Sequence, residues 1–134
     1  MRAYDQKSDL IPMPTSFVLD SNVCNHKSRV VATFGGGSIS FVVESSCPLV
    51  NEFGRSLSSS PLKVREITRR ICENPIYIKA TENNVHPNCV VPCGVAMCGW
   101  AEAGLVSKTL LERFPSQCVT YERGGGREID LNKS

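Results

Sequence analysis

Cysteines constrain this chain more than any other residue type. The 134 residues include seven cysteines, an odd number, so at least one thiol has no partner for a disulfide within the chain. Residues Met1–Pro14 contain charges and two prolines but lack the apolar run of a secretory signal, which predicts a cytoplasmic protein. In a reducing compartment a cysteine-rich chain more often binds metal or performs redox chemistry than forms disulfides. We therefore expect a mixture of metal ligands in loops and buried thiols that pack as small apolar side chains.

Length and charge limit the possible folds and partners. A chain of 134 residues can form one domain with its own hydrophobic core. A net charge of +2 does not predict a nucleic-acid partner, which calls for a clustered basic surface. No segment reaches the roughly 20 apolar residues needed for membrane insertion. We expect a single domain at 15–123, preceded by a flexible leader at 1–14 and followed by a disordered tail at 124–134.

Two central segments have the pattern of paired strands. Apolar and polar residues alternate along Ser38–Glu44, and Arg29–Phe34 is rich in β-favouring residues. The glycines at 35–37 lie between them and predict a tight hairpin turn. Shorter strands are expected at Ser16–Asp20 and at Cys118–Glu122.

Helix start signals occur at three places. Ser46-Cys47-Pro48 combines a capping serine with a proline at the first helical position, and Ser60-Pro61 repeats that combination. Pro92 should open a third helix that runs to about Leu105. In the second helix we expect Val64, Ile67 and Ile71 to face inward. A further helical turn is expected at 108–113, whereas 74–80 is ambiguous between a strand and a helical turn. The predicted fold class is α+β, a small antiparallel sheet (a β-hairpin plus edge strands) covered by two or three helices.

Three cysteines occupy positions that suit metal ligands. Cys24 follows a strand in a turn, Cys47 begins a helix, and Cys89 lies in a loop bounded by two prolines. Loops at the ends of elements let side chains from distant parts of the chain converge, and helix N-termini lower the pKa of a thiol. We therefore predict that Cys24, Cys47 and Cys89 bind a metal centre.

The fourth ligand is left open by the spacing. Cys93 is one candidate, because iron–sulfur clusters prefer four thiolates. His86 is the other, and it would complete a Cys3His zinc site. If neither residue binds, the fourth iron is open to a substrate or a partner. The remaining thiols, Cys72, Cys98 and Cys118, are expected to be buried packing residues.

Several short motifs follow one another between residues 20 and 122. They are Val23-Cys24, Ser46-Cys47-Pro48, Asn74-Pro75-Ile76-Tyr77 with Ala80, His86, Cys89 with Val91-Pro92, and Ala103-Gly104-Leu105. In order and spacing they resemble a small cysteine-containing family of unknown function from anaerobic archaea and bacteria. The resemblance implies that the recurring cysteines of that family match Cys24, Cys47 and Cys89. An anaerobic setting favours iron–sulfur over zinc, but the resemblance supplies no activity.

The sequence departs from this pattern on the third helix. Where relatives carry lysine and glutamate, this chain has Met97 and Trp100, and it adds Cys98. The resemblance therefore does not carry a role of those charged residues over to this chain, and Met97 with Trp100 is expected to form a new apolar contact instead.

These observations favour a metal-binding protein over an enzyme. The expected function is to hold an iron–sulfur cluster, of the 4Fe-4S type, through three or four cysteines, as an electron carrier or accessory subunit of a larger anaerobic redox enzyme. One alternative is a structural Cys3His zinc site in a protein-interaction module. The other is a metal-free thiol redox protein that uses Cys89 with Cys93 or Cys47. The sequence shows no Ser/His/Asp arrangement or paired carboxylates, so we do not expect an enzyme that acts on its own.

Overall fold

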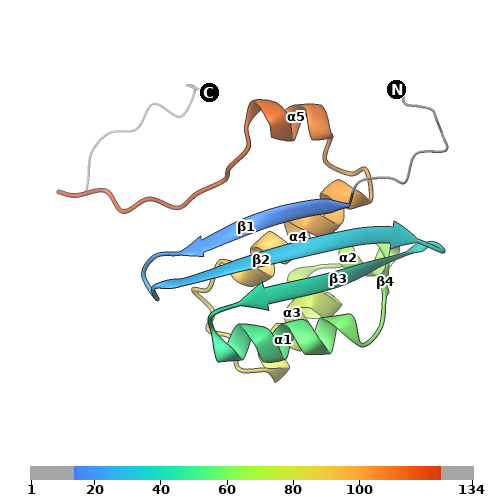
Figure 1. The fold of residues 1–134 in the computed structure, drawn as a ribbon, viewed down its shortest axis with the longest axis horizontal. Coiled ribbons are helices and arrows are strands. Elements are labelled where there is room, and N and C mark those ends of the chain that lie inside the picture. Colours follow the sequence, from blue (N-terminus) through green and yellow to red (C-terminus); the bar gives the residue numbers. More distant parts are fainter. Residues whose placement is uncertain (1–13, 125–134) are drawn as a thin grey trace.

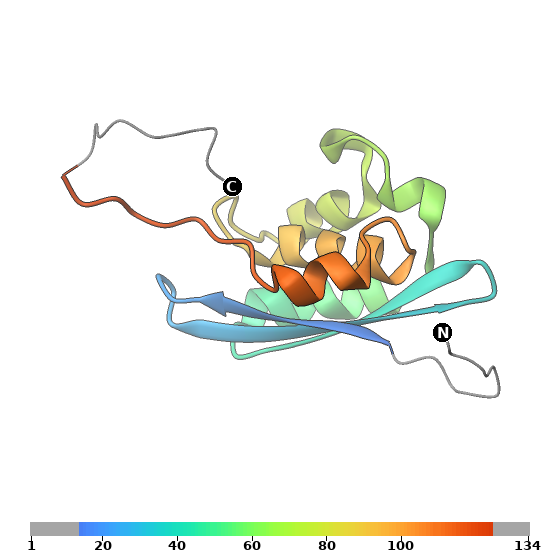
Figure 2. The ribbon, with the colours of Figure 1, turned by 90° about the horizontal axis from the view of Figure 1, so that it is seen from above.

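The protein folds into two layers, a sheet and a set of helices packed on one of its faces (Figures 1 and 2). The structure, a computed structural model, describes residues 14–124. Along the chain the elements are β1 (Thr15–Ser21), β2 (His26–Gly35), β3 (Ser38–Ser45), α1 (Pro48–Ser58), β4 (Leu62–Lys63), α2 (Val64–Ile67), the 3-10 helix η1 (Ile71–Glu73), α3 (Pro75–Glu82), α4 (Val91–Glu102) and α5 (Lys108–Arg113). The predicted α+β class is confirmed. The expected leader and tail lie, apart from Pro14 and Gly124, outside the described residues.

The sheet is antiparallel throughout, with the strand order β1-β2-β3-β4. β2 lies in the middle of the long strands, and its Val30 is paired with Phe17 of β1 and Val43 of β3. Gly36 and Gly37 form the β2–β3 turn with φ of 62° and 80°, a conformation that glycine adopts without strain. The predicted hairpin is therefore confirmed.

The hydrophobic core lies between the sheet and the helices. Alternate strand residues point toward the helices, as the period of two requires. Each of the following core side chains is exposed by less than 2%: Val30, Ile39, Phe41, Phe53, Leu57, Ile67, Ile76, Val91, Val95 and Cys98.

Two glycines let α4 lie unusually close to the sheet. A Cβ atom on Gly94 would lie 2.2 Å from Cδ2 of Leu19, and one on Gly99 would lie 2.8 Å from Cζ of Phe41. Both distances are shorter than real carbon contacts, so a larger residue would push the helix away. This close packing fixes the start of α4 and the loop before it, which carries Cys89.

The second helix is shorter than expected. Leu62 and Lys63 pair with β3 instead of continuing the helix that Ser60-Pro61 predicts, and α2 is a single turn. The carbonyl of Ile67 accepts hydrogen bonds from Trp100 Nε1 at 2.8 Å and Asn74 Nδ2 at 3.0 Å. In a longer helix this carbonyl would accept from a backbone N–H, so the two side chains replace a helical hydrogen bond. Ile71, expected to face inward, is 67% exposed.

Two other local expectations are resolved by the structure. The ambiguous segment 74–80 belongs to α3, where the Asn74 side chain caps the helix by accepting from the Ile76 N–H at 3.0 Å. The segment Cys118–Glu122 is not a strand, since in the described part of the chain it has no strand beside it. None of the described helices is long and apolar enough to cross a membrane.

Candidate metal centre

Cys24 lies in the tight turn between β1 and β2. Its N–H donates to the carbonyl of Ser21 at 3.1 Å, and Asn25 adopts φ of 60° to complete the turn. Asparagine is one of the few residues other than glycine that tolerates this left-handed conformation. The turn leaves the Cys24 side chain exposed.

Cys47 lies at the N-cap of α1, directly after β3. Its N–H donates to Ser45 Oγ at 2.9 Å, and its carbonyl accepts from the Asn51 N–H at 3.0 Å. The side chain is half-buried and packs against the core. Pro48 at the first helical position starts the helix as predicted, but the cap is Cys47 and not Ser46.

Ser46 ties the Cys47 segment to the strand that leaves the Cys24 turn. Ser46 Oγ accepts from the Lys27 N–H at 3.2 Å, and the Ser46 N–H donates to the Lys27 carbonyl at the same distance. The same hydroxyl lies 2.9 Å from His26 Nδ1. These contacts hold the approach to Cys47 beside the start of β2, two residues after Cys24.

Cys89 lies in the loop that joins α3 to α4. Its N–H donates to the His86 carbonyl at 3.0 Å, and its half-buried side chain packs against the core. Burial is the main cause that raises the pKa of the Cys89 thiol, and a hydrogen bond from the Val91 backbone acts in the opposite direction. Negative charge on Cys47 and on Cys24 raises the pKa further.

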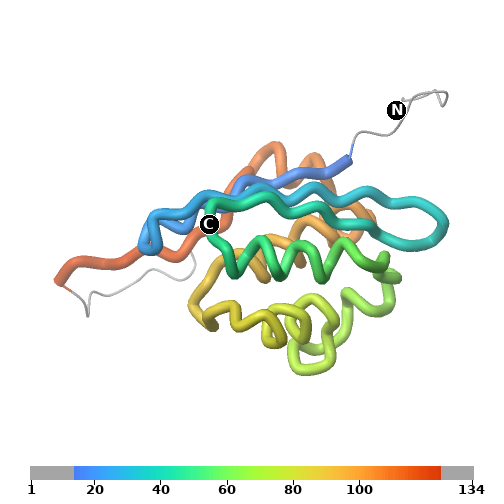
Figure 3. Tube along the Cα trace, turned by 60° about the horizontal axis from the view of Figure 1, so that its bottom comes forward, coloured from blue at the N-terminus to red at the C-terminus, as the bar shows by residue number. Residues whose placement is uncertain are grey.

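Three segments far apart in sequence therefore meet at one end of the molecule. The β1–β2 turn, the β3–α1 connection and the α3–α4 loop lie at the same end of the sheet in both Figure 1 and Figure 3. The thiols of Cys24 and Cys47 are near enough for their charges to act on Cys89. Within residues 14–124, however, no three side chains of His, Cys, Asp or Glu are arranged to hold a metal ion.

Comparison with known proteins gives a family but no activity. Residues 15–114 match a family of unknown function, DUF6951. The chain belongs to DUF6951. No curated protein and no solved structure matches the chain.

The DUF6951 match spans every residue nominated as a ligand, together with Cys72 and Cys98, and it excludes only Cys118 among the cysteines. Because the family is of unknown function, the match assigns no role to any of these residues.

The two candidates for a fourth ligand are placed differently in this DUF6951 protein. Cys93, on the first turn of α4, is exposed and lies near enough to Tyr77 of α3 for the two side chains to interact. The pKa of Tyr77 is raised by burial first, and then by the interaction with Cys93. His86 is exposed, and its backbone carbonyl is what contacts Cys89. The charges that act on Cys89 are those of Cys47 and Cys24, so the structure groups these three and directs Cys93 toward Tyr77.

The three segments that carry the thiols contain no formal charge, although charged residues border them directly, at Asp20, Lys27, Glu44, Glu52 and Glu82. Residues 21–26, 45–51 and 83–93 include no Asp, Glu, Lys or Arg, although these types make up 21% of the chain. Val23 beside Cys24 is 97% exposed, and Val90 beside Cys89 is 41% exposed. Protein interfaces are depleted of charged residues at their core. This uncharged end, defined by those three segments, therefore has the composition of a docking surface.

The other thiols differ in accessibility. Cys98 is fully buried and donates to the Thr15 carbonyl at 3.2 Å, and burial raises its pKa to about 12. The prediction that it packs in the core is confirmed. Cys72 and Cys118 are exposed, so the prediction that they are buried is wrong. Cys72 ends up exposed because the helix that would have turned it inward is replaced by η1.

Two interactions, one near this region and one at the far end of β1, could not be found from the sequence. Tyr77 contacts Cys93 because α3 packs beside α4, a relation that spacing along the chain does not reveal. Glu102 gave no signal either, because its hydrogen-bond partners lie 68 and 87 positions away.

Proposed function

We propose that this protein binds an iron–sulfur cluster, of the 4Fe-4S type, through the thiolates of Cys24, Cys47 and Cys89. The observation that supports this most directly is the convergence of three separate segments, such that the charges of Cys24 and Cys47 act on the Cys89 thiol. Cysteinate sulfurs are the usual ligands of such clusters. The proposed setting is the cytoplasm of an anaerobic organism, where thiols stay reduced and exposed clusters survive.

The chemistry of the three residues fits this group. Metal ligands must be deprotonated, and the pKa of Cys89 is raised first by burial and then by repulsion from Cys47 and Cys24; a bound cation relieves that repulsion. The Val91 N–H that points at the Cys89 sulfur is the kind of hydrogen bond that adjusts the reduction potential of a cluster. Because the thiols do not form a preorganised ion site, binding should draw the exposed Cys24 turn toward Cys47 and Cys89.

The role proposed for the cluster is electron transfer to or from a protein partner, as a carrier or an accessory subunit of a larger redox enzyme. The uncharged end supports this role, since a partner that docks there would cover the cluster and exclude water from it. Electron transfer needs a cofactor near the surface, and the Cys24 turn is exposed.

Metal analysis of protein purified without oxygen tests the proposal. We expect about four irons and four acid-labile sulfides per chain, the stoichiometry of a 4Fe-4S cluster, with visible absorbance that fades on reduction by dithionite. Cys24→Ala, Cys47→Ala and Cys89→Ala should each lose most of the iron. Cys72→Ala is the matched control, because Cys72 is an exposed thiol on η1, outside the three segments, and it should keep full iron content.

Two further variants identify the fourth ligand. Cys93→Ala lowers the iron content only if Cys93 leaves Tyr77 to bind, and His86→Ala lowers it only if the imidazole binds. Protein without iron and sulfide, even after reconstitution, would overturn the proposal. One zinc per chain that is lost in His86→Ala would replace it with the structural zinc site.

A further inference from the structure

The described residues contain an unpaired sheet edge and an unpaired segment with strand-favouring residues. β1 is the edge of the sheet, and within residues 14–124 no strand pairs with its outer side. The segment 117–122 follows α5 as extended chain, and its Val119 and Tyr121 are 98% and 87% exposed. Valine, threonine and tyrosine favour strands, and unpaired strand edges are templates for a further strand. The segment 117–122 therefore has the composition of a strand that fits the unpaired edge of β1.

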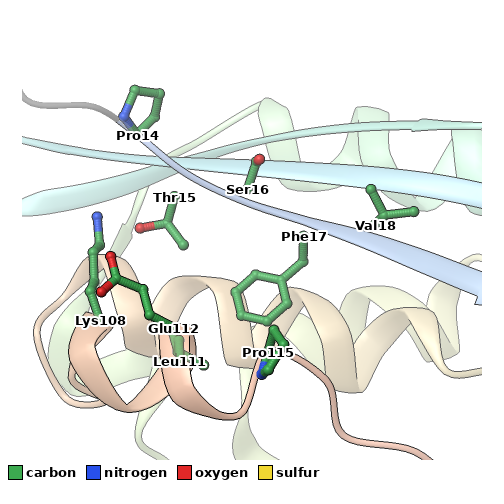
Figure 4. Close-up of a pocket in the computed structure, with 9 residues that line it drawn as sticks. All are labelled: Pro14, Thr15, Ser16, Phe17, Val18, Lys108, Leu111, Glu112 and Pro115. Carbon is green, nitrogen blue, oxygen red and sulfur yellow. The ribbon is translucent and has the colours of Figure 1, made fainter.

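A groove runs beside the free edge of β1. Two cavities of about 520 Å³ and 390 Å³ lie between β1 and the α5 region, and both are lined by Phe17, Leu111 and Pro115. Figure 4 shows Phe17 pointing from β1 toward Leu111 and Pro115. α5 contains no buried residue, so it lies over this edge without filling the space beneath it. The part of the groove beside Phe17, Leu111 and Pro115 is apolar, whereas Lys108 and Glu112 line its end near the start of β1.

The segment 117–122 leaves its own groove. Ser116 and Gln117 line the second cavity, and beyond them the chain runs away from the domain (Figures 1 and 2). Pro115, at the start of this departure, restricts the backbone between α5 and the segment. A strand-like segment that is directed away from its own groove is positioned to enter the groove of another molecule.

We propose that the protein forms a two-fold symmetric dimer in which residues 117–122 of each copy pair with β1 of the other. Exchange of identical segments is a common route to dimers, and strand addition at a sheet edge supplies backbone hydrogen bonds. Val119 and Tyr121 are two positions apart, so both face the same side and enter the apolar groove. Antiparallel pairing brings Glu122 to the start of β1, where Lys108 lines the groove (Figure 4).

Light scattering on the reduced full chain tests the dimer. A reductant prevents a disulfide through the exposed Cys118. We expect a dimer for the full chain, and a folded monomer both for a chain that ends at Pro115 and for the double variant Val119→Lys, Tyr121→Lys. The matched control is Val42→Lys, at a valine of β3 that is 54% exposed and lies outside the groove, and it should stay dimeric.

A pair of charge substitutions tests whether the segment and β1 pair in the antiparallel direction. Lys108→Glu should weaken the dimer, and adding Glu122→Lys should restore it, which a purely local role of Lys108 within its own chain would not produce. A monomeric full chain would overturn the proposal, including one whose amides at 117–122 are protected by docking onto their own β1. A dimer that survives truncation at Pro115 would overturn it as well.

Discussion

At the scale of single residues, Glu102 joins three segments of the fold. Its side chain is only 9% exposed. Oε1 accepts from the Thr15 N–H at 3.1 Å and from Thr15 Oγ1 at 2.7 Å, while Oε2 accepts from the Phe34 N–H at 2.9 Å. The end of α4 is thereby fastened to the start of β1 and the end of β2. Lys108 Nζ, 3.8 Å away, supplies a nearby positive charge.

We predict that Glu102→Gln lowers the free energy of unfolding by about 1–3 kcal/mol, the usual cost of leaving a buried hydrogen-bonding group unsatisfied. The glutamine amide has only one oxygen, so its NH2 group must face an N–H donor that bonds to the carboxylate in the unsubstituted protein. Urea unfolding measures the loss. Glu82→Gln, at an exposed position of α3, should change stability little, and equal losses in both variants would contradict the role given to Glu102.

At the scale of elements, the sequence predicted correctly where local pattern decides the structure. The alternation in Ser38–Glu44 and the glycines at 35–37 identify the β2–β3 hairpin, because strand period and turn chemistry are local properties. The prediction failed at 60–63, where pairing of Leu62 with Ile39 of β3 overrides the helix signal of Ser60-Pro61. Helix propensity is weak enough for such a tertiary contact to win.

The candidate site likewise has features that local sequence pattern predicts and features that depend on tertiary contacts. Loop and helix-start positions nominate Cys24, Cys47 and Cys89, and their segments do meet at one end of the sheet. Cys93 also lies at a helix start, but the packing of α3 beside α4 gives it Tyr77 as a neighbour. The sequence shows which cysteines lie at the ends of helices and strands. Which neighbour each thiol meets depends on how the helices pack against one another.

We predict that Gly99→Ala destabilises the protein despite the better helix propensity of alanine. The added methyl would lie 2.8 Å from Cζ and 3.2 Å from Cε1 of the buried Phe41, so either this ring or α4 must shift. Overpacking costs about 1–3 kcal/mol, more than the gain of about 1 kcal/mol from replacing glycine. Thermal unfolding measures the difference, with Thr109→Ala on exposed α5 as the control that alters propensity alone. A more stable Gly99→Ala variant would show that α4 can shift away from the sheet.

At the scale of the whole molecule, the three segments that carry the thiols contain no charged side chain, and the nearest charges border them, at Asp20 and Lys27 for example. The net charge is only +2, and the three segments contribute nothing to it. A long-range field from side chains is therefore weak there in the protein without a cluster. Under the proposed function, the negative charge of the cluster and its thiolates is then the main charge at this end.

We predict that salt slows reduction of the cluster-loaded protein by a small cationic mediator and speeds reduction by a small anionic one, because the cluster and its thiolates are negatively charged and the three segments around them supply no positive charge. Stopped-flow absorbance at several salt concentrations measures these rates. Val23→Lys, at a side chain that is 97% exposed beside Cys24, should make both salt dependences smaller. The opposite salt dependence in the unsubstituted protein would mean that positive charges elsewhere on the molecule control the approach.

Glu102 and the three thiols lie at opposite ends of β1, and this separation has a consequence for how the fold is closed. Thr15, at the start of the strand, is bound by Glu102, whereas Ser21, at its end, leads directly into the turn of Cys24. The start of β1 is fastened by side chains of the protein itself. At the other end, Ser46 already joins the start of β2 to the Cys47 segment, and under the proposed function the Cys24 turn is linked to Cys47 and Cys89 only when a cluster is bound. The rigidity of that turn would therefore depend on how much iron and sulfide the cell can supply.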